Sequence, residues 1–166
     1  KASIGSQGND GIGSYKYTDI YSVSNDGAGG IAVAFSQKGN PNITWETNGN
    51  LNIGAEFGFF QGRLYGNIDY FHRKTTDMLF YFSVPSSLGY SGYYANVGDM
   101  VNQGIEVELG ADIIRRKNFV WNFGLNLTHY KNKITRLPEE YKNNTTDDGK
   151  LKGYNSGSRF LAEGQP

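Results

Sequence analysis

Hydrophobic and polar residues alternate along the stretch 43–59. The odd-numbered positions are mainly apolar or small, whereas the even-numbered positions are polar, small or charged and include Glu46 and Glu56. A period of two places these sets on opposite faces of a β-strand. The run is roughly three times as long as a typical strand of ~5–6 residues. A strand that crosses a bilayer needs ~9–11 residues with alternating lipid and lumen sides, so the pattern predicts a membrane strand that projects beyond the bilayer.

The same alternation recurs in the stretches 63–70, 105–113 and 119–128. The polar positions are expected to face an aqueous lumen. The predicted lumen face includes Glu46, Glu56, Asn67, Asp69, Glu106, Glu108, Asn122 and Asn126. The apolar positions are expected to face lipid. The predicted lipid face includes Leu51, Ile53, Phe57, Ile68, Ile105, Val107, Leu109, Phe123 and Leu125.

Two kinds of connection separate these stretches. The short links 60–63 and 115–118 have the length of hairpin turns, whereas the connections 5–42, 74–102 and 131 onward are long. Outer-membrane barrels show this asymmetry, with short periplasmic turns and long extracellular loops. The sequence therefore predicts an all-β, antiparallel segment of a transmembrane barrel, with a hairpin from the first long connection on its extracellular rim.

The connection 75–98 is unusually aromatic for an exposed loop. One interpretation is a loop that folds into the barrel mouth and buries its rings on its neighbours, since apolar area favours burial. The other is a surface that contacts cargo or a partner protein, since loops often carry binding residues. On aromatic density alone, the candidate contact residues are Tyr90, Tyr93 and Tyr94.

Composition and charge narrow the classes of function. The 166 residues carry 16 basic and 16 acidic side chains. Without a basic stripe, no nucleic-acid partner is expected. No cysteine is present, which excludes disulfides and thiolate sites. Mean hydropathy is −0.55, a value that also fits a barrel wall, where half of each strand is polar. A basic cluster, 115–117, lies in a predicted turn and is either solvated or in contact with acidic headgroups.

Catalytic chemistry is not expected from this chain. His72 and His129 are the only histidines, and neither has a partner spaced as a metal ligand or catalytic dyad requires. Glu106 and Glu108 share one strand face and fit a polar lumen wall better than an acid–base pair. The segment 147–149 lacks the later ligands of a calcium loop. No cofactor, metal or enzymatic activity is predicted.

One known family matches most of the chain. Asn40-Pro41-Asn42-Ile43-Thr44-Trp45-Glu46 resembles the NP-x-L-x-WE signature of SusC/RagA-type TonB-linked outer-membrane transporters. Further similar segments follow in the family's order. They are Gln7-Gly8-Asn9-Asp10, Asp69-Tyr70-Phe71, Lys74-Thr75-Thr76-Asp77-Met78-Leu79, Pro85-Ser86-Ser87, Tyr94-Ala95-Asn96-Val97-Gly98, Asn102-Gln103-Gly104-Ile105-Glu106, Asn126-Leu127-Thr128, Asn132-Lys133-Ile134 and Gly164-Gln165-Pro166.

This resemblance implies a barrel of 22 strands with an N-terminal plug, energised by TonB and covered by a SusD-like surface lipoprotein. It implies import of oligosaccharide or peptide across the lipid of the outer membrane of a Gram-negative, Bacteroides-type bacterium. Residues 1–166 are then expected to be a fragment of the barrel domain, without signal peptide and plug. Two alternatives stay open: a soluble, secreted all-β carbohydrate-binding module, and a passive porin.

Overall fold

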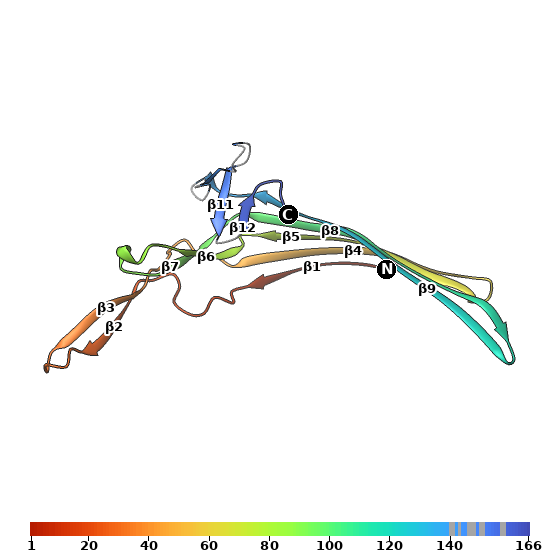
Figure 1. The fold of residues 1–166 in the computed structure, drawn as a ribbon, viewed down its shortest axis with the longest axis horizontal. Coiled ribbons are helices and arrows are strands. Elements are labelled where there is room, and N and C mark those ends of the chain that lie inside the picture. The colour runs from red at the N-terminus through yellow and green to blue at the C-terminus, as the bar shows by residue number, and fades with distance from the viewer. Residues whose placement is uncertain (140–141, 143, 146–148, 150–151, 157–158) are drawn as a thin grey trace.

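The computed structural model forms one long, curved sheet with smaller elements at one end (Figure 1). It describes residues 1–139, 142, 144–145, 149, 152–156 and 159–166. The main sheet is antiparallel, with the strand order β1-β4-β5-β8-β9. Its strands are β1 (Ala2–Asn9), β4 (Glu46–Phe59), β5 (Leu64–Thr76), β8 (Asp99–Arg116) and β9 (Phe119–Arg136). The predicted antiparallel all-β wall is confirmed.

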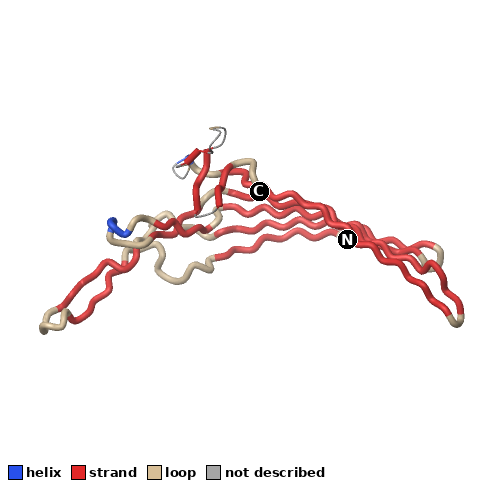
Figure 2. Tube along the Cα trace, viewed as in Figure 1, coloured by secondary structure: helices blue, strands red, loops and turns tan. Residues whose placement is uncertain are grey.

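The shorter elements gather beyond the opposite end of the sheet from the two tight turns (Figures 1 and 2). They form two hairpins, a 3-10 turn and a small three-stranded sheet. Their bounds are β2 (Ile20–Asn25), β3 (Ile31–Gln37), β6 (Leu79–Ser83), η1 (Ser86–Leu88), β7 (Gly92–Asn96), β10 (Asn144–Thr145), β11 (Lys152–Ser156) and β12 (Arg159–Ala162). The predicted asymmetry between turns and loops is therefore present, including the rim hairpin β2–β3. Among the described residues, no helix has the length and apolar character that a membrane crossing requires.

The turn between β4 and β5 has a backbone that suits a tight hairpin. Phe60, Gln61 and Gly62 all have positive φ, and the amide of Arg63 donates to the carbonyl of Phe60 at 3.3 Å. Two central residues with positive φ define a type I′ turn, whose twist matches that of the flanking strands. The turn between β8 and β9 is shorter, since Arg116 pairs with Phe119; Arg115 and Arg116, predicted to belong to this turn, lie in β8.

The pairing register places the two predicted sets on opposite faces. Ala55 pairs with Ile68, Ile68 with Val107, and Val107 with Leu127. Residues directly opposite each other in an antiparallel pair share a face, so this one row across four strands is entirely apolar. The neighbouring row joins Glu56, Asn67, Glu108 and Asn126. The alternation was thus predicted correctly on β4, β5 and β9, and on β8 as far as Asp112.

Two strand details differ from the sequence prediction. The alternating run was expected to begin at residue 43, but β4 begins at Glu46, because residues 40–44 turn and bond to other parts of the rim. Ile113 was expected to continue the apolar set of β8. A register shift between Asp112 and Ile114 places Ile114, not Ile113, opposite Trp121. A bulge of this kind bends the strand near its turn and raises the local twist.

The apolar face of the sheet is not covered by a second layer of the described chain. Its side chains keep large exposed fractions, with 50% for Ile53, 46% for Ile68, 48% for Ile105 and 55% for Leu127. The packed hydrophobic cluster lies elsewhere, around Phe82. A soluble sandwich needs two apolar faces that meet each other. The uncovered face therefore speaks against the soluble module and fits a surface solvated by lipid.

The apolar side chains of the outward, lipid-facing side form a band that crosses the strands obliquely. If the band lies parallel to the membrane, its angle to the strands gives their tilt from the barrel axis. On β4 the outward apolar side chains run from Leu51 to Phe59, and on β9 from Leu127 to Phe119. Leu51 shares a row with Lys131, so the band is displaced by 131 − 127 = 4 residues over three strand spacings. At ~3.3 Å per residue and ~4.8 Å per strand, this gives a tilt of about 42°. Transmembrane barrels tilt their strands by ~35–45°.

Candidate functional site

The rim at the loop end of the sheet is tied together by asparagine side chains. The amide group of Asn96 donates to the carbonyls of Thr44 at 2.9 Å and Asp77 at 2.7 Å, and its oxygen accepts from the amide of Thr44 at 2.8 Å. Asn40 donates to the carbonyl of Tyr94 at 3.1 Å. These two side chains fix the β6–β7 hairpin to the segment that leads into β4, which gives a structural reason for asparagine in both motifs.

The guanidinium of Arg136 joins the rim ends of β8 and β9. Arg136 Nε donates to Asp99 Oδ2 at 3.0 Å and Nη2 donates to Asp99 Oδ1 at 3.1 Å. The same guanidinium lies 3.0 Å from Asp77 Oδ1. Because Arg136 bonds to the charged form of Asp99, the pKa of this carboxyl group is lowered, although partial burial opposes the shift. The guanidinium holds the connection between β5 and β6 against the sheet.

Gly98 allows the chain to pass between β7 and β8. Its φ is +68°, and a Cβ atom there would lie 1.8 Å from the carbonyl oxygen of Arg136. No L-residue with a side chain fits both conditions without a shift of the backbone. Gly104 is a second close approach, where a Cβ would meet the carbonyl of His129 at 2.5 Å. Both glycines that flank the start of β8 are thus positions of close backbone approach.

The three candidate tyrosines lie on different parts of the rim. Tyr93 stacks on Phe82 with ring centroids 5.7 Å apart, on the face that packs against the hydrophobic cluster. Tyr94 belongs to the other face of the same hairpin. It pairs with Tyr81 at 5.1 Å, and Lys16 Nζ lies 5.4 Å from its ring centroid.

Tyr90 connects the loop after η1 to the β2–β3 hairpin. Its ring lies 5.6 Å from Phe35, which in turn lies 5.2 Å from Tyr21. Tyr90 and Tyr94 are half-buried, whereas Tyr81 is 40% exposed and donates to or accepts from Ser91 at 3.0 Å. Sequence density alone did not separate Tyr93, which packs on the hydrophobic cluster, from Tyr94, which pairs with the exposed ring of Tyr81.

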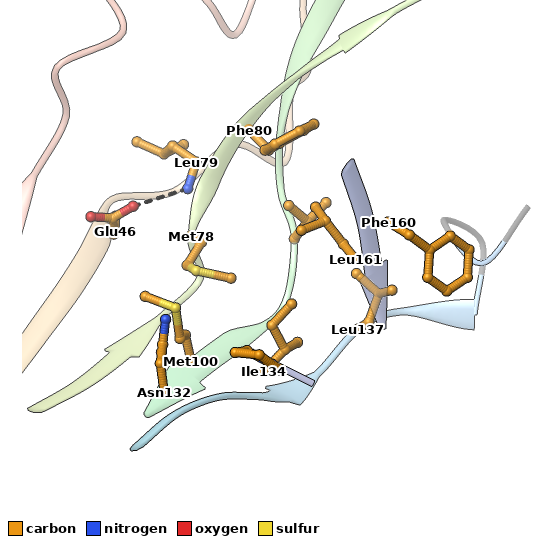
Figure 3. A pocket seen from close by; sticks show the side chains of 12 residues that line it. Glu46, Met78, Leu79, Phe80, Met100, Asn132, Ile134, Leu137, Phe160 and Leu161 are labelled. Atoms are coloured by element: carbon orange, nitrogen blue, oxygen red, sulfur yellow. Dashed lines mark hydrogen bonds between the residues drawn. The ribbon is translucent and has the colours of Figure 1, made fainter. Parts of the chain in front are cut away.

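An apolar cavity of about 560 Å³ lies between the start of β6, the rim ends of β8 and β9, and β12 (Figure 3). Both methionines, Met78 and Met100, line it together with Ile134 and Leu161. Its polar edge carries Glu46, whose Oε2 accepts from the amide of Leu79 at 3.2 Å. Methionine adapts to irregular apolar surfaces. The cavity can therefore receive a hydrophobic group. No periodic pattern in the sequence indicates it, because its lining comes from five separate segments.

Glu46 and the other acidic lumen-face residues differ in their surroundings. Glu46 Oε1 accepts from Asn9 at 3.3 Å and from Asn48 at 3.1 Å, so its role at the rim is structural. Lower on the wall, Lys1 Nζ lies 3.3 Å from Glu56 and 3.1 Å from Asp69. The lumen face thus combines paired and open carboxylates, as expected of a wall in contact with water and not of a catalytic pair.

Among the described residues, no group of three or more His, Cys, Asp or Glu side chains could hold a metal ion. His72 faces outward and its Nδ1 lies 3.1 Å from Gln103 Oε1. His129 pairs with Ile105 on the neighbouring strand. The segment 147–149, considered as a calcium-loop fragment, lies largely outside the described residues, since 147 and 148 are not among them.

The two-faced, tilted sheet with short turns at one end and built-up loops at the other is part of the wall of a transmembrane β-barrel. The family model "TonB dependent receptor-like, beta-barrel" matches residues 5–160. The chain belongs to this family. The resemblance to SusC/RagA-type transporters is likewise supported by named relatives and solved structures.

These relatives are much longer proteins. The chain is 34% identical over 140 residues to TonB-dependent receptor P26 of Formosa agariphila, which covers 82% of the chain and 14% of that receptor. It is 36% identical over 99 residues to TonB-dependent receptor SusC of Bacteroides thetaiotaomicron, with 59% and 10% covered. The structure of the RagAB peptide transporter matches with a TM-score of 0.79 and 28% identity, covering 100% of the chain and 18% of that protein.

Proposed function

We propose that the protein containing this chain imports a nutrient, oligosaccharide or peptide, through a Gram-negative outer membrane, with energy supplied through TonB and with a SusD-like lipoprotein over its mouth. The observation that carries the proposal is the match of the whole described segment to the wall of the RagAB peptide transporter, at a TM-score of 0.79. Within that protein, residues 1–166 contribute barrel wall and extracellular rim.

The rim offers a surface for the cargo or the lipoprotein. We propose that Tyr90, Tyr93 and Tyr94 all serve this surface, Tyr90 and Tyr94 by direct contact and Tyr93 by support. Tyr94 pairs with the exposed ring of Tyr81, and the cation of Lys16 lies over the Tyr94 ring. Exposed aromatic rings suit stacking on a sugar or contact with an aromatic side chain. Tyr93 acts by holding the hairpin through Phe82.

Uptake by the full-length protein tests the transport proposal. Cells with and without the gene are given labelled oligosaccharides in one experiment and labelled peptides in another, before and after the proton-motive force is collapsed. Energy-dependent uptake that requires the gene supports the proposal and identifies the cargo class. Gene-dependent uptake that persists unchanged without the proton-motive force would instead identify a passive porin.

The tyrosine proposal has its own test, which distinguishes contact from support. Tyr94→Ala is expected to weaken capture of the lipoprotein or cargo while folding is retained, and Tyr94→Phe is expected to preserve most of it, since the ring stays. Tyr93→Phe is expected to behave like the parent protein because its stacking partner is still Phe82. If Tyr90→Ala, Tyr93→Ala and Tyr94→Ala together leave both uptake and lipoprotein affinity unchanged, none of the three is a contact residue.

A further inference from the structure

A groove on the outward face lies where the apolar band meets the rim. It is lined by Ile4 and Ser6 on β1, Gly49 and Leu51 on β4, and His72 and Lys74 on β5. These residues belong to consecutive outward rows, since Ile4 pairs with Leu51 and Leu51 with His72, while Ser6 pairs with Gly49 and Gly49 with Lys74. The row nearer the apolar band has apolar residues, Ile4 and Leu51, on two strands. The row nearer the rim places the small residues Ser6 and Gly49 beside the cation of Lys74.

Gly49 creates the hollow. It lacks a side chain, and the nearest atom to a Cβ placed there is the carbonyl oxygen of Lys74 at 3.7 Å. This is an ordinary van der Waals distance, and the backbone of Gly49 is not in the positive-φ region. The backbone at position 49 would accept a residue with a side chain, so the space results from the absence of a side chain at Gly49.

Histidine and lysine follow each other in the same order on the outward face of two strands. Toward the rim, the successive outward residues on β5 are Tyr70, His72 and Lys74, and those on β9 are Leu127, His129 and Lys131. With strands tilted by about 42°, His72 and His129 lie a few ångströms above the apolar band, and Lys74 and Lys131 lie about 8–10 Å above it. That height is the headgroup region of the bilayer.

Opposing charge is scarce at these outward positions. Three outward rows, those of Ile53, Leu51 and Gly49, lead from the apolar band toward the rim. None of their residues on the five strands carries a carboxylate. Asp99, the first residue of β8, is close enough for Lys74 to help lower its pKa. Its carboxylate, however, already accepts hydrogen bonds from Arg136. Lys74, Lys131 and Lys133 form no ion pair within the described part of the chain.

We propose that this groove binds a phosphate-bearing lipid of the outer leaflet, whose acyl chain lies on Ile4 and Leu51 and whose phosphate lies against His72 and Lys74. Lys131 on β9 contacts a second anionic group of the same headgroup layer. The occupant is a lipid and not a soluble anion, because the cations stand directly above an exposed apolar surface. The proposal needs the wall orientation of the sheet but not nutrient import, so the two can fail separately.

Native mass spectrometry of the full-length protein in detergent tests the site. The probes are lipid A with two phosphates, the same lipid with its phosphates removed, and inorganic phosphate. A cation near a membrane surface contributes about fivefold to anionic-lipid binding, so the loss of two cations in the Lys74→Gln, Lys131→Gln double variant is expected to weaken binding of phosphorylated lipid A about 25-fold. The matched Lys74→Arg, Lys131→Arg variant is expected to bind like the parent protein.

Two further variants separate the site from general charge effects. Gly49→Leu, which fills the groove without removing charge, is expected to weaken binding of the phosphorylated lipid several-fold. Removal of two charges at the opposite end, Arg116→Gln with Lys117→Gln, is expected to leave the retained lipid unchanged. Equal binding of the phosphate-free lipid, unchanged binding by the Lys74→Gln, Lys131→Gln variant, or full competition by inorganic phosphate would each overturn the proposal. Heat-dependent gel mobility reports whether each variant has folded.

Discussion

An arginine placed on either face of β9 provides a sharp test of the wall. Leu125 and Asn126 are adjacent and uncharged, but they lie on opposite faces, since Leu125 pairs with Leu109 and Asn126 with Glu108. On β9 the band extends from residue 119 to 127, so Leu125 lies one outward position from its centre. Arg at the bilayer midplane costs about 2–4 kcal/mol on the lipid face of a barrel. For Leu125→Arg we expect about 2–3 kcal/mol.

At 1.4 kcal/mol per factor of ten, this cost corresponds to a roughly 30- to 140-fold change in the folding equilibrium. Asn126→Arg introduces the same side chain one residue later, facing the carboxylate of Glu108 across the strand pair, and is expected to change the equilibrium less than about twofold. The assay is a urea titration of the full-length protein in lipid vesicles, followed by tryptophan fluorescence and heat-modifiable gel mobility. Equal costs for the two variants, or a larger cost for Asn126→Arg, would refute the assignment of faces.

Three further predictions concern the rim. Gly98→Ala is expected to destabilise the β7–β8 connection by more than about 2 kcal/mol, because of its positive φ and the carbonyl of Arg136, whereas Gly58→Ala, which meets nothing within 4 Å, should be close to neutral in the same unfolding assay. Asn96→Asp replaces a donor by a carboxylate opposite two carbonyls and should increase proteolytic cleavage of the β6–β7 hairpin several-fold; an unchanged cleavage rate would contradict the role of that side chain. Because the folded-state pKa of Asp99 is lowered, its contribution is complete above the ordinary pKa of about 3.9 and is lost as pH falls through the lower, folded value. Rim protection against an acid-active protease should therefore decrease below about pH 4, and Asp99→Asn should remove this part of the pH dependence.

The strands of the wall were predictable because one physical rule governs them. A strand between lipid and lumen must alternate with period two, and β4, β5, β8 and β9 do so. The same rule identified both tight turns. What it could not anticipate are local departures from regular pairing, such as the bulge at Asp112, since a bulge depends on how one residue fits between two strands and not on alternation.

The rim was less predictable because its contacts join segments that are far apart in sequence. The aromatic density of residues 75–98 indicated a special surface, but only the pairing of β6 with β7 shows that Tyr93 and Tyr94 point to opposite faces. The hydrogen bonds of Asn96 to Thr44 span 52 residues. Side-chain amides carry no periodic signal, so their role becomes visible only when the two segments are seen together.

The central claim is that β8 lies between lipid on one side and water on the other. The chain contains no cysteine, so single cysteines at positions 105 to 109 of the full-length protein can carry spin labels in lipid vesicles, provided that any cysteine elsewhere is removed. Accessibility is measured to oxygen, which concentrates in lipid, and to a water-soluble nickel chelate. The account predicts that Ile105, Val107 and Leu109 favour oxygen and that Glu106 and Glu108 favour the chelate. A uniform profile, or chelate access at all five positions, would contradict it.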